Sequence, residues 1–279
     1  MRSELPLDSW LRGAACVDLR DAASHDASRP AGSVRLEVDD LLYRPYLLPP
    51  RARPLVLVGG PAASMRLVVK ALGAAGHADV RHVPEETWRE LLPEETGAPT
   101  RQHLWEPAVA VVEALRDHAQ RAALAGTLPT ALDVACGSGR NAVYMALRGY
   151  DVTAIDILPD ALVKAAELAS RSGVSIRTVQ RDVTFAGALD DERADVVVVV
   201  RFLDRVLLGS LQRAVKPGGI LVYETFTVEQ AGIGHPRNPR YLLEPEELSH
   251  AFPQLETLVY REGFFDGAYL ARLIARRRV

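Results

Sequence analysis

Residues 132–142 read "LDVACGSGRNA", and this stretch decides how the larger part of the chain folds. Its apolar start predicts a buried strand, which leads into a G-x-G-x-x-A pattern formed by Gly137, Gly139 and Ala142. Glycines in such a loop let the backbone approach a ligand closely, and the helix that follows offers its N-terminal N–H groups. The stretch therefore predicts a cofactor loop between a strand and a helix.

Downstream of residue 105, segments typical of strands alternate with segments typical of helices. Helices are expected over residues 106–126, 139–148, 159–171 and 203–215. This alternation predicts parallel βαβ units in a doubly wound α/β sheet. The last segment, "LETLVYREGFFDGAYLARLIARRR" at 255–278, instead predicts two strands around the turn "FFDG". We therefore expect a mostly parallel sheet that ends in an antiparallel hairpin.

The bulk composition is that of an ordinary globular protein, with 48% hydrophobic and 25% charged residues. A net charge of -3 gives no global field that would attract nucleic acid or an anionic membrane. No apolar run reaches the roughly 20 residues that span a bilayer, and "MRSELPLDSW" lacks the apolar core of a signal peptide. The two cysteines, Cys16 and Cys136, argue against a disulfide framework. We expect a cytoplasmic protein without nucleic-acid or membrane partners.

The glycine pattern alone fits either the dinucleotide of a dehydrogenase or the cofactor of a methyltransferase. Asp156, about 20 residues after the first glycine, could accept from ribose hydroxyls in both cases. Asp133 favours a ligand that carries a sulfonium and an ammonium group, because a carboxylate there would repel a pyrophosphate. Asp182 could accept from an adenine amino group, and the backbone N–H of Val183 could meet a ring nitrogen.

Residues 132–157, "LDVACGSGRNAVYMALRGYDVTAIDI", resemble the first two motifs of class I S-adenosylmethionine-dependent methyltransferases. The segments "RDV", "VVVVVRFL" and "VKPGGILVYETF" continue the resemblance in order, and within the class the tellurite-resistance type is most similar. The resemblance covers about residues 105–279. It implies a seven-stranded sheet, S-adenosyl-L-methionine as the cofactor and a small-molecule methyl acceptor. Ala135 departs from the pattern, because the class has its first glycine at this position.

The resemblance also assigns a part of the cofactor to each motif. It places the methionine end against Asp133, Ala135, Cys136, Gly137 and Gly139, the ribose and adenine edges against Asp156 and Ile157, and adenine against Asp182 and Val183. Arg201 would lie against the cofactor and face the substrate. The alternative for these residues is structural: Asp133 accepts loop N–H groups, Asp182 caps a turn, and Cys136 is a buried filler.

Candidate catalytic residues lie at the ends of the fourth and fifth strands and in the loop that follows. They are Arg201, Glu224, His235 and Arg237, and no metal site is expected. Arginines could bind an anionic substrate bidentately, and a histidine has a pKa suited to a base. A soft anion, such as a thiolate or a chalcogen oxyanion, would need little base catalysis. Alternatively, the loop residues are ordinary surface side chains.

The N-terminal part resembles a rhodanese-like domain, carried by "CVDLRDAASHDASRPAGSVRL" at 16–36 and "PLVLVGGPAASMRLVVKALGAAGHADVRHV" at 54–83. A rhodanese needs a thiolate at the start of its active loop. This chain has Gly59 there, so we expect no sulfurtransferase activity and a role in packing, gating or protein contact.

The expected organisation is thus a rhodanese-like domain over 1–83, a linker over 84–104 and a methyltransferase domain over 105–279. This organisation permits a monomer. Two other functions stay open. One is a non-catalytic sensor or scaffold that binds S-adenosylmethionine, and the other is a nicotinamide-dependent oxidoreductase.

Overall fold

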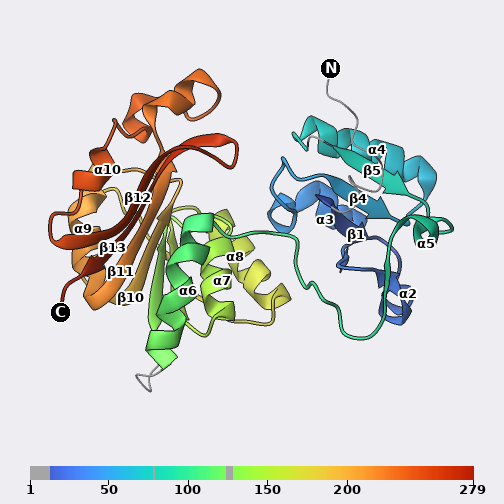
Figure 1. Cartoon of the computed structure of the whole chain (residues 1–279), viewed down its shortest axis with the longest axis horizontal. Coiled ribbons are helices and arrows are strands. Elements are labelled where there is room, and N and C mark those ends of the chain that lie inside the picture. The colour runs from blue at the N-terminus through green and yellow to red at the C-terminus, as the bar shows by residue number, and fades with distance from the viewer. Residues whose placement is uncertain (1–12, 78, 124–127) are drawn as a thin grey trace. The chain divides into compact units, whose positions relative to one another are not determined.

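The computed structural model describes residues 13–77, 79–123 and 128–279. The chain divides into two compact units, Met1–Glu106 and Pro107–Val279 (Figure 1). Each unit has its own sheet, and each is described by itself.

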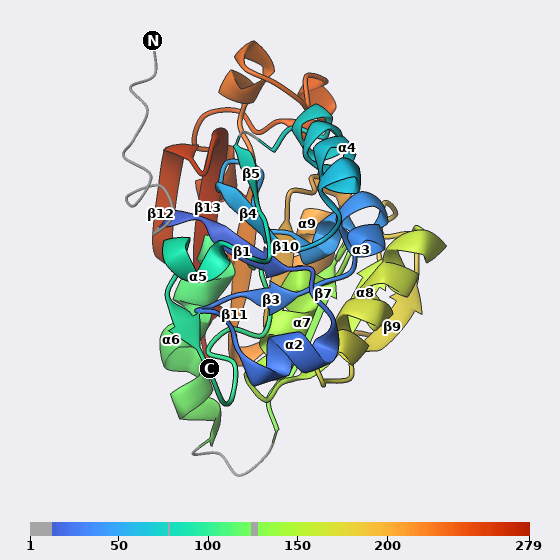
Figure 2. The same cartoon turned by 90° about the vertical axis from the view of Figure 1, so that its right-hand side faces the viewer.

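The first unit is built on a four-stranded parallel sheet in the order β3-β1-β4-β5. The strands, in that order, span Val34–Arg35, Ala15–Asp18, Leu55–Val58 and Val80–Val83. Helices α3 (Val38–Tyr43) and α4 (Ala62–Ala74) lie on one side of this sheet, and α5 (Trp88–Leu91) lies on the other (Figure 2). A short helix α2 (Ala22–Ala27) follows β1. This is an α/β unit of the kind that the sequence predicts.

The segment 84–104, which the sequence predicts to be a linker, is folded into the first unit. Trp88 is fully buried and packs in one cluster with Cys16, Val56, Val58 and Val83. Further on, β6 (Glu94–Glu95) pairs antiparallel with β2 (Arg29–Pro30). The unit boundary therefore lies at Glu106, because a tryptophan in a polar, proline-rich segment completes the core.

Glu95 fixes the end of this segment. Its carboxylate accepts the backbone N–H of Gly32 at 2.9 Å, and both the N–H and the hydroxyl of Thr100 at 2.7 Å. These hydrogen bonds, the one from Gly32 above all, lower the pKa of Glu95 to about 2. The carboxylate therefore stays ionised and holds the segment down at any ordinary pH.

The second unit contains a seven-stranded sheet in the order β12-β13-β11-β10-β7-β8-β9. The strands, in that order, span Leu255–Phe265, Ala268–Arg277, Val215–Phe226, Ala194–Val200, Thr130–Val134, Asp151–Asp156 and Arg177–Gln180. The five strands from β11 to β9 are parallel, whereas β13 is antiparallel to both β11 and β12. Asp266 and Gly267, both with positive φ, form the hairpin turn. The predicted mostly parallel sheet and its closing hairpin are confirmed.

Helices cover both faces of this sheet. Helices α6 (Val109–Ala123), α7 (Arg140–Leu147) and α8 (Pro159–Arg171) lie on one side, with α9 (Leu208–Ala214) and α10 (Glu247–His250) on the other (Figure 1). The helix expected over 203–215 begins later, as a 3-10 turn over Arg205–Leu207 that runs into α9. The delay has a local cause, because the side chain of Asp204 caps that turn by accepting from Val206 N–H at 3.0 Å.

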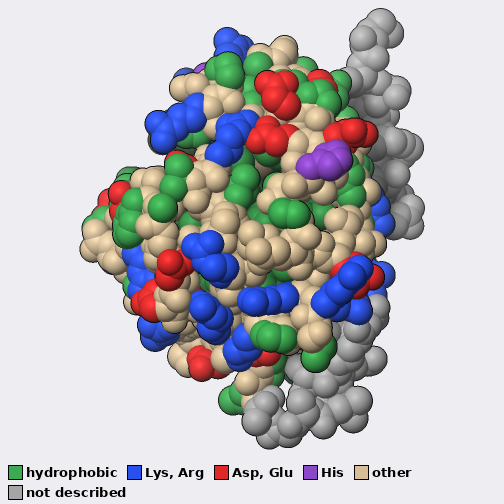
Figure 3. Space-filling view, turned by 90° about the vertical axis from the view of Figure 1, so that its left-hand side faces the viewer, with side chains coloured by type: hydrophobic (Ala, Val, Ile, Leu, Met, Phe, Trp, Pro, Cys, Tyr) green, Lys and Arg blue, Asp and Glu red, His purple; other side chains and the backbone are tan. Residues whose placement is uncertain are grey.

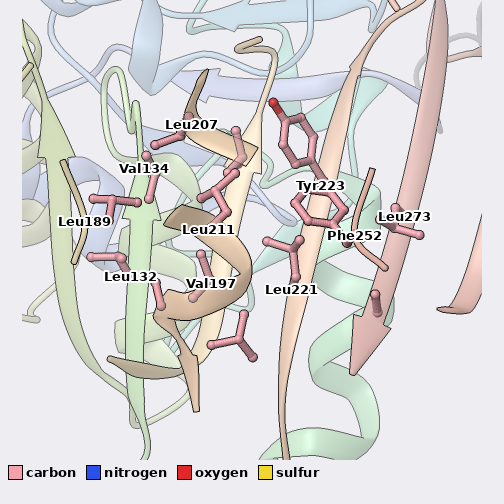
Figure 4. Packing of buried hydrophobic residues seen from close by; sticks show 14 of the residues in the cluster. Leu132, Val134, Leu189, Val197, Leu207, Leu211, Leu221, Tyr223, Phe252 and Leu273 are labelled. Carbon is pink, nitrogen blue, oxygen red and sulfur yellow. The ribbon is translucent and has the colours of Figure 1, made fainter. Parts of the chain in front are cut away.

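One hydrophobic core cluster of the second unit lies between the sheet and helices α9 and α10. Alternate residues of neighbouring strands, such as Leu132, Val197 and Leu221, point into one cluster with Leu211 of α9 (Figure 4). The ring of Tyr223 lies 6.0 Å from that of Phe252. The opposite residues of the same strands, Asp133 among them, therefore face the side of α6, α7 and α8.

The surface in Figure 3 shows lysine and arginine side chains interspersed with acidic ones. No helix among the residues that the structure describes combines the length and the apolar character needed to cross a bilayer.

Candidate active site

The predicted site residues of the second unit follow the carboxyl ends of parallel strands. Because these ends lie at one edge of a parallel sheet, that edge is where such folds bind ligands. Asp133 lies near the end of β7, Asp156 ends β8, and Arg201 directly follows β10. The sheet thus brings together segments that are far apart in the sequence.

The loop between β7 and α7 has three residues in the left-handed region: Ala135 at φ 56°, Gly137 at φ 54° and Gly139 at φ 78°. A Cβ atom on Gly137 would have no described heavy atom within 4 Å, so its backbone borders open space. A Cβ atom on Gly139 would instead lie 2.6 Å from Cβ of Ala165 in α8. Gly137 is therefore the glycine that leaves room for a ligand, while Gly139 allows close packing against α8.

Asp156 ties this loop to the neighbouring strand. One carboxylate oxygen accepts the backbone N–H of Gly137 at 2.8 Å, and the other accepts that of Leu158 at 3.0 Å. A carboxylate has about four acceptor positions, so two bonds leave capacity for hydroxyls of a ligand. Ile157, which follows, is 51% exposed.

Asp133 is buried beneath the same loop. Its Oδ2 accepts the backbone N–H of Ala142, in the first turn of α7, at 2.9 Å. Burial, reinforced by the charge of Asp156, raises the pKa of Asp133 to about 7. One oxygen of Asp133 thus accepts a backbone N–H, as the structural alternative predicts. The pKa of its carboxyl group lies near neutrality.

Cys136 is buried and free of any disulfide. Its N–H donates to the carbonyl of Ile155 at 2.9 Å, which joins the loop to β8. Burial raises the pKa of the Cys136 thiol, so a thiolate is disfavoured. The geometry agrees with the alternative in which Cys136 is a filler.

The segment after β9 forms a small turn. Asp182 is exposed, and its Oδ1 accepts both the N–H of Thr184 at 2.8 Å and the hydroxyl at 2.7 Å. These hydrogen bonds lower the pKa of Asp182. Val183 is buried in the core cluster. Asp182 therefore caps a turn, as the structural alternative predicts, and its contact with adenine stays a prediction.

Arg201 stands at the end of β10 in a strained conformation, with φ 57°. Its N–H donates to the carbonyl of Glu224 at 2.7 Å. Its exposed guanidinium lies over the ring of Phe226, 5.5 Å from the centroid. The arginine that follows five valines is thus not buried, because the strand ends there and the side chain turns out onto an aromatic ring.

Glu224, predicted at the end of the fifth strand, instead lies inside β11, two residues before the strand ends at Phe226. It is buried, and its Oε2 accepts from Nε of Arg272 in β13 at 2.6 Å. The same guanidinium also reaches Asp266 in the hairpin turn. Burial raises the pKa of Glu224, although Arg272 opposes this. Glu224 therefore joins β11 to the hairpin through Arg272.

His235 and Arg237 are exposed in the loop after β11. Sequence reasoning missed the residue that holds this loop, which is the buried Gln230. Its Oε1 accepts the N–H of Tyr269 at 2.9 Å, and its Nε2 donates to the carbonyl of His235 at 3.1 Å. Nothing in the sequence marks Gln230, because both partners are backbone atoms and one of them, Tyr269, is 39 residues away in the sequence.

Gly59 stands where the predicted rhodanese resemblance would have its thiol, and a side chain at this position would meet Arg20. Gly59 has φ 79°, and a Cβ atom there would lie 2.7 Å from Cγ of Arg20. Arg20 is itself held by Asp18, with Nε to Oδ1 at 2.9 Å and a second bond at 2.7 Å. Among the residues that the structure describes, no group of three or more His, Cys, Asp or Glu side chains could hold a metal ion.

Residues 131–219 match a family model described as a methyltransferase domain. The chain is similar to ubiquinone biosynthesis O-methyltransferases, with 33% identity over 99 residues to that of Rickettsia prowazekii and 35% over 132 residues to that of Pseudomonas putida. These matches cover 34% and 44% of this chain. A protein called hemagglutinin 1 of Eikenella corrodens is 28% identical over 139 residues, 47% of this chain.

The chain spans only about two fifths to a half of the length of these relatives, at 38%, 51% and 45% in the same order. Among solved structures, TehB from Haemophilus influenzae is 21% identical with a TM-score of 0.46, covering 58% of this chain and 62% of its own. The methyltransferase NodS from Bradyrhizobium japonicum with S-adenosyl-l-homocysteine is 20% identical with a TM-score of 0.43, covering 60% and 87%. Within the second unit, the match to a methyltransferase domain thus extends over residues 131–219. The fold of the unit rests on the strand order given above.

Proposed function

We propose that the second unit transfers a methyl group from S-adenosylmethionine to a small-molecule acceptor. The observation that carries the proposal is the backbone of Gly137, which borders open space and is hydrogen-bonded to Asp156, in a segment that matches a methyltransferase domain. Asp156 lies on one side of this backbone, hydrogen-bonded to it, and Asp133 lies beneath the loop.

The residues present fit this cofactor better than a dinucleotide. Asp133 and Asp156 interact electrostatically, which adds to the raised pKa of Asp133. A cation nearby would favour the charged form of Asp133, whereas a pyrophosphate would be repelled. When bound, the cofactor supplies an electrophilic methyl group on a sulfonium. Asp133 would stabilise the positive end of the ligand, and Asp156 would accept from its ribose.

On the acceptor side, the described residues that we expect to meet a substrate are exposed positioning groups. Arg201 is aimed outward at the edge of the sheet, and Arg237 and His235 are exposed in the adjacent loop. Arginines can orient an anionic nucleophile, and an acceptor that is already ionised needs no base. A soft anion such as a thiolate or a chalcogen oxyanion satisfies this requirement, with His235 available for a proton where one must move.

For the first unit we propose a rhodanese-like module without sulfurtransferase activity, which serves protein contact or gating. Support comes from its parallel sheet and from Gly59, where the side chain of Arg20 occupies the space that a Cβ atom would need. Formation of thiocyanate from thiosulfate and cyanide measures sulfurtransferase activity directly. Activity above that of a heat-inactivated sample would contradict the proposal that this unit has none.

The test of the main proposal is calorimetric titration with S-adenosylhomocysteine, with NAD as the competing ligand. We expect micromolar binding, about -8 kcal/mol, and no comparable binding of NAD. Asp156→Ala removes an acceptor at the site and should cost about 1.5–3 kcal/mol. Asp151→Ala is the matched control, because Asp151 is exposed at the opposite end of the same strand. Binding of NAD alone would point to an oxidoreductase, and binding without turnover on any acceptor to a sensor.

A further inference from the structure

A buried carboxylate and an exposed cation are neighbours at the carboxyl end of β11. Glu224 and Phe226 are two residues apart in this strand, so their side chains point to the same face of the sheet. The backbone N–H of Arg201 donates to the carbonyl of Glu224 at 2.7 Å, and its guanidinium lies over the ring of Phe226. Arg201 and the carboxylate of Glu224 therefore share one face, where they interact electrostatically.

The same face carries Asp133 of the proposed cofactor site. Val198 of β10 pairs with Asp133 of β7 on one side and with Val222 of β11 on the other. Side chains that are directly opposite each other in a sheet point to the same face, and Val222 and Glu224 are two residues apart. Glu224 thus lies two strands away from Asp133 and one side-chain layer nearer the carboxyl edge. An acceptor held by Arg201 would lie at the edge of the face that we propose for the cofactor.

The two carboxylate oxygens of Glu224 differ in their partners. Oε2 accepts from Nε of Arg272 at 2.6 Å, and the same guanidinium also binds Asp266 in the hairpin turn. Within the described part of the chain, no group donates a hydrogen bond to Oε1. Arg201 likewise has no carboxylate within ion-pair distance among the residues that the structure describes. Arg201 and Oε1 therefore interact through their charges, while both keep their hydrogen-bonding capacity.

The charges around Glu224 come from several elements. Burial raises the pKa of Glu224 above its usual value, although Arg272 of β13 and the nearby Arg201 oppose this, and Asp266 adds to the rise. Helix α6, which packs against β11, brings the carboxylate of Glu113. That carboxylate is already paired, with Arg261 of β12 at 2.8 Å. Glu224 is therefore a carboxylate whose ionisation depends on the charges that surround it.

We infer that Glu224 couples the binding of an anionic acceptor to the uptake of a proton. The inference rests on the proposed function, in which Arg201 orients the acceptor, and it adds a second ion to that step. An anion at Arg201 places negative charge near Glu224, and a like charge favours the neutral form of a carboxyl group. A proton from solvent therefore binds Oε1 as the anion binds. The resulting O–H can donate a hydrogen bond to the anion, whereas the carboxylate would repel it.

The experiment is a calorimetric titration of the full chain, saturated with S-adenosylhomocysteine. The titrant is methanesulfinate, a soft chalcogen oxyanion that stays ionised throughout the pH range used. Titrations at pH 6 in buffers of different ionisation enthalpy measure how many protons bind with each anion. We expect uptake of a measurable fraction of a proton, and an affinity at pH 8 that is at least about threefold weaker than at pH 6.

Variants assign the proton to its residue. Glu224→Gln should abolish the proton uptake and strengthen binding at pH 8, because the competing charge is gone. Asp266→Asn is the matched control, since Asp266 also binds Arg272 but lies in the exposed hairpin turn, and it should keep the proton uptake. His235→Gln should keep it too, and this exposed position provides a test even where Glu224→Gln fails to fold.

Four results would overturn the inference. They are failure of methanesulfinate to bind, binding without proton uptake, uptake that is lost in His235→Gln, and unchanged binding in Arg201→Gln. The last result would place the anion away from Arg201. Failure of S-adenosylhomocysteine to bind would instead overturn the proposed function itself.

Discussion

Gly139 and Ala165 lie so close that a Cβ atom added to Gly139 would lie 2.6 Å from Cβ and 2.9 Å from Cα of Ala165. The contact joins the cofactor loop to α8. We expect Gly139→Ala to destabilise the protein by about 2–4 kcal/mol, because overpacking and a positive φ both oppose the new methyl group. Urea unfolding measures this difference.

Gly137→Ala provides the control for that experiment. It has a similar positive φ but open space around the added atom. Its cost in stability should be only about 1–2 kcal/mol, while its effect should fall on cofactor binding. Equal destabilisation by the two variants would show that the packing against Ala165 contributes nothing.

Ala135 carries a strain that a glycine would relieve. Its φ of 56° lies in the left-handed region, which costs residues with a Cβ atom about 1–2 kcal/mol. We expect Ala135→Gly to stabilise the protein by up to about 1 kcal/mol, because the greater freedom of glycine in the unfolded chain offsets part of the relief. The midpoint of urea unfolding should rise. Ala166→Gly, at an exposed position inside α8, should lower it by about 1 kcal/mol.

The titration of Asp133 should make the stability of the protein depend on pH. Burial raises the pKa of Asp133 from 3.8 to about 7, so the folded state holds this proton to a higher pH than the unfolded chain. The stabilising contribution is complete below pH 4 and is lost as the pH rises through 7. Each pKa unit corresponds to about 1.4 kcal/mol.

Asp133→Asn isolates this contribution, since an asparagine Oδ1 can still accept from Ala142. As the pH rises from 4 to 7.5, the free energy of unfolding of the variant should increase by a few kcal/mol relative to that of wild type. Urea unfolding at each pH measures this difference. All other titrating groups are common to both proteins and cancel. Parallel pH profiles for the two proteins would mean that Asp133 ionises in the fold as it does in water.

Substitution of Trp88 tests whether residues 84–104 belong to the first unit. Removal of a fully buried tryptophan should cost about 3–5 kcal/mol, so Trp88→Ala should greatly lower the unfolding midpoint of that unit. Leu91→Ala, in the same short helix but 40% exposed, should cost less than about 1 kcal/mol. Similar small effects from both variants would restore the idea of a linker.

Much of the second unit could be predicted because its signals are local. The alternation of apolar strands with helices, the glycine loop and the Asp266–Gly267 turn depend on residues close together in sequence, and the observed strand order confirms them. The segment around Trp88 was missed for the opposite reason, because only the packing of α5 onto β1 and β4 makes that side chain part of a core.

The sequence by itself determined the α/β class, the parallel sheet with its closing hairpin and the position of the glycine loop between β7 and α7, since periodicity and backbone preference act over a few residues. The tertiary structure decided which polar groups stay free. Glu224 becomes half of a buried ion pair because β13 places Arg272 directly opposite it. Arg201 stays exposed beyond the end of β10, although the buried carboxylate of Glu224 on β11 interacts with it electrostatically. Partners distant in sequence are chosen by strand order and register, which no local pattern encodes.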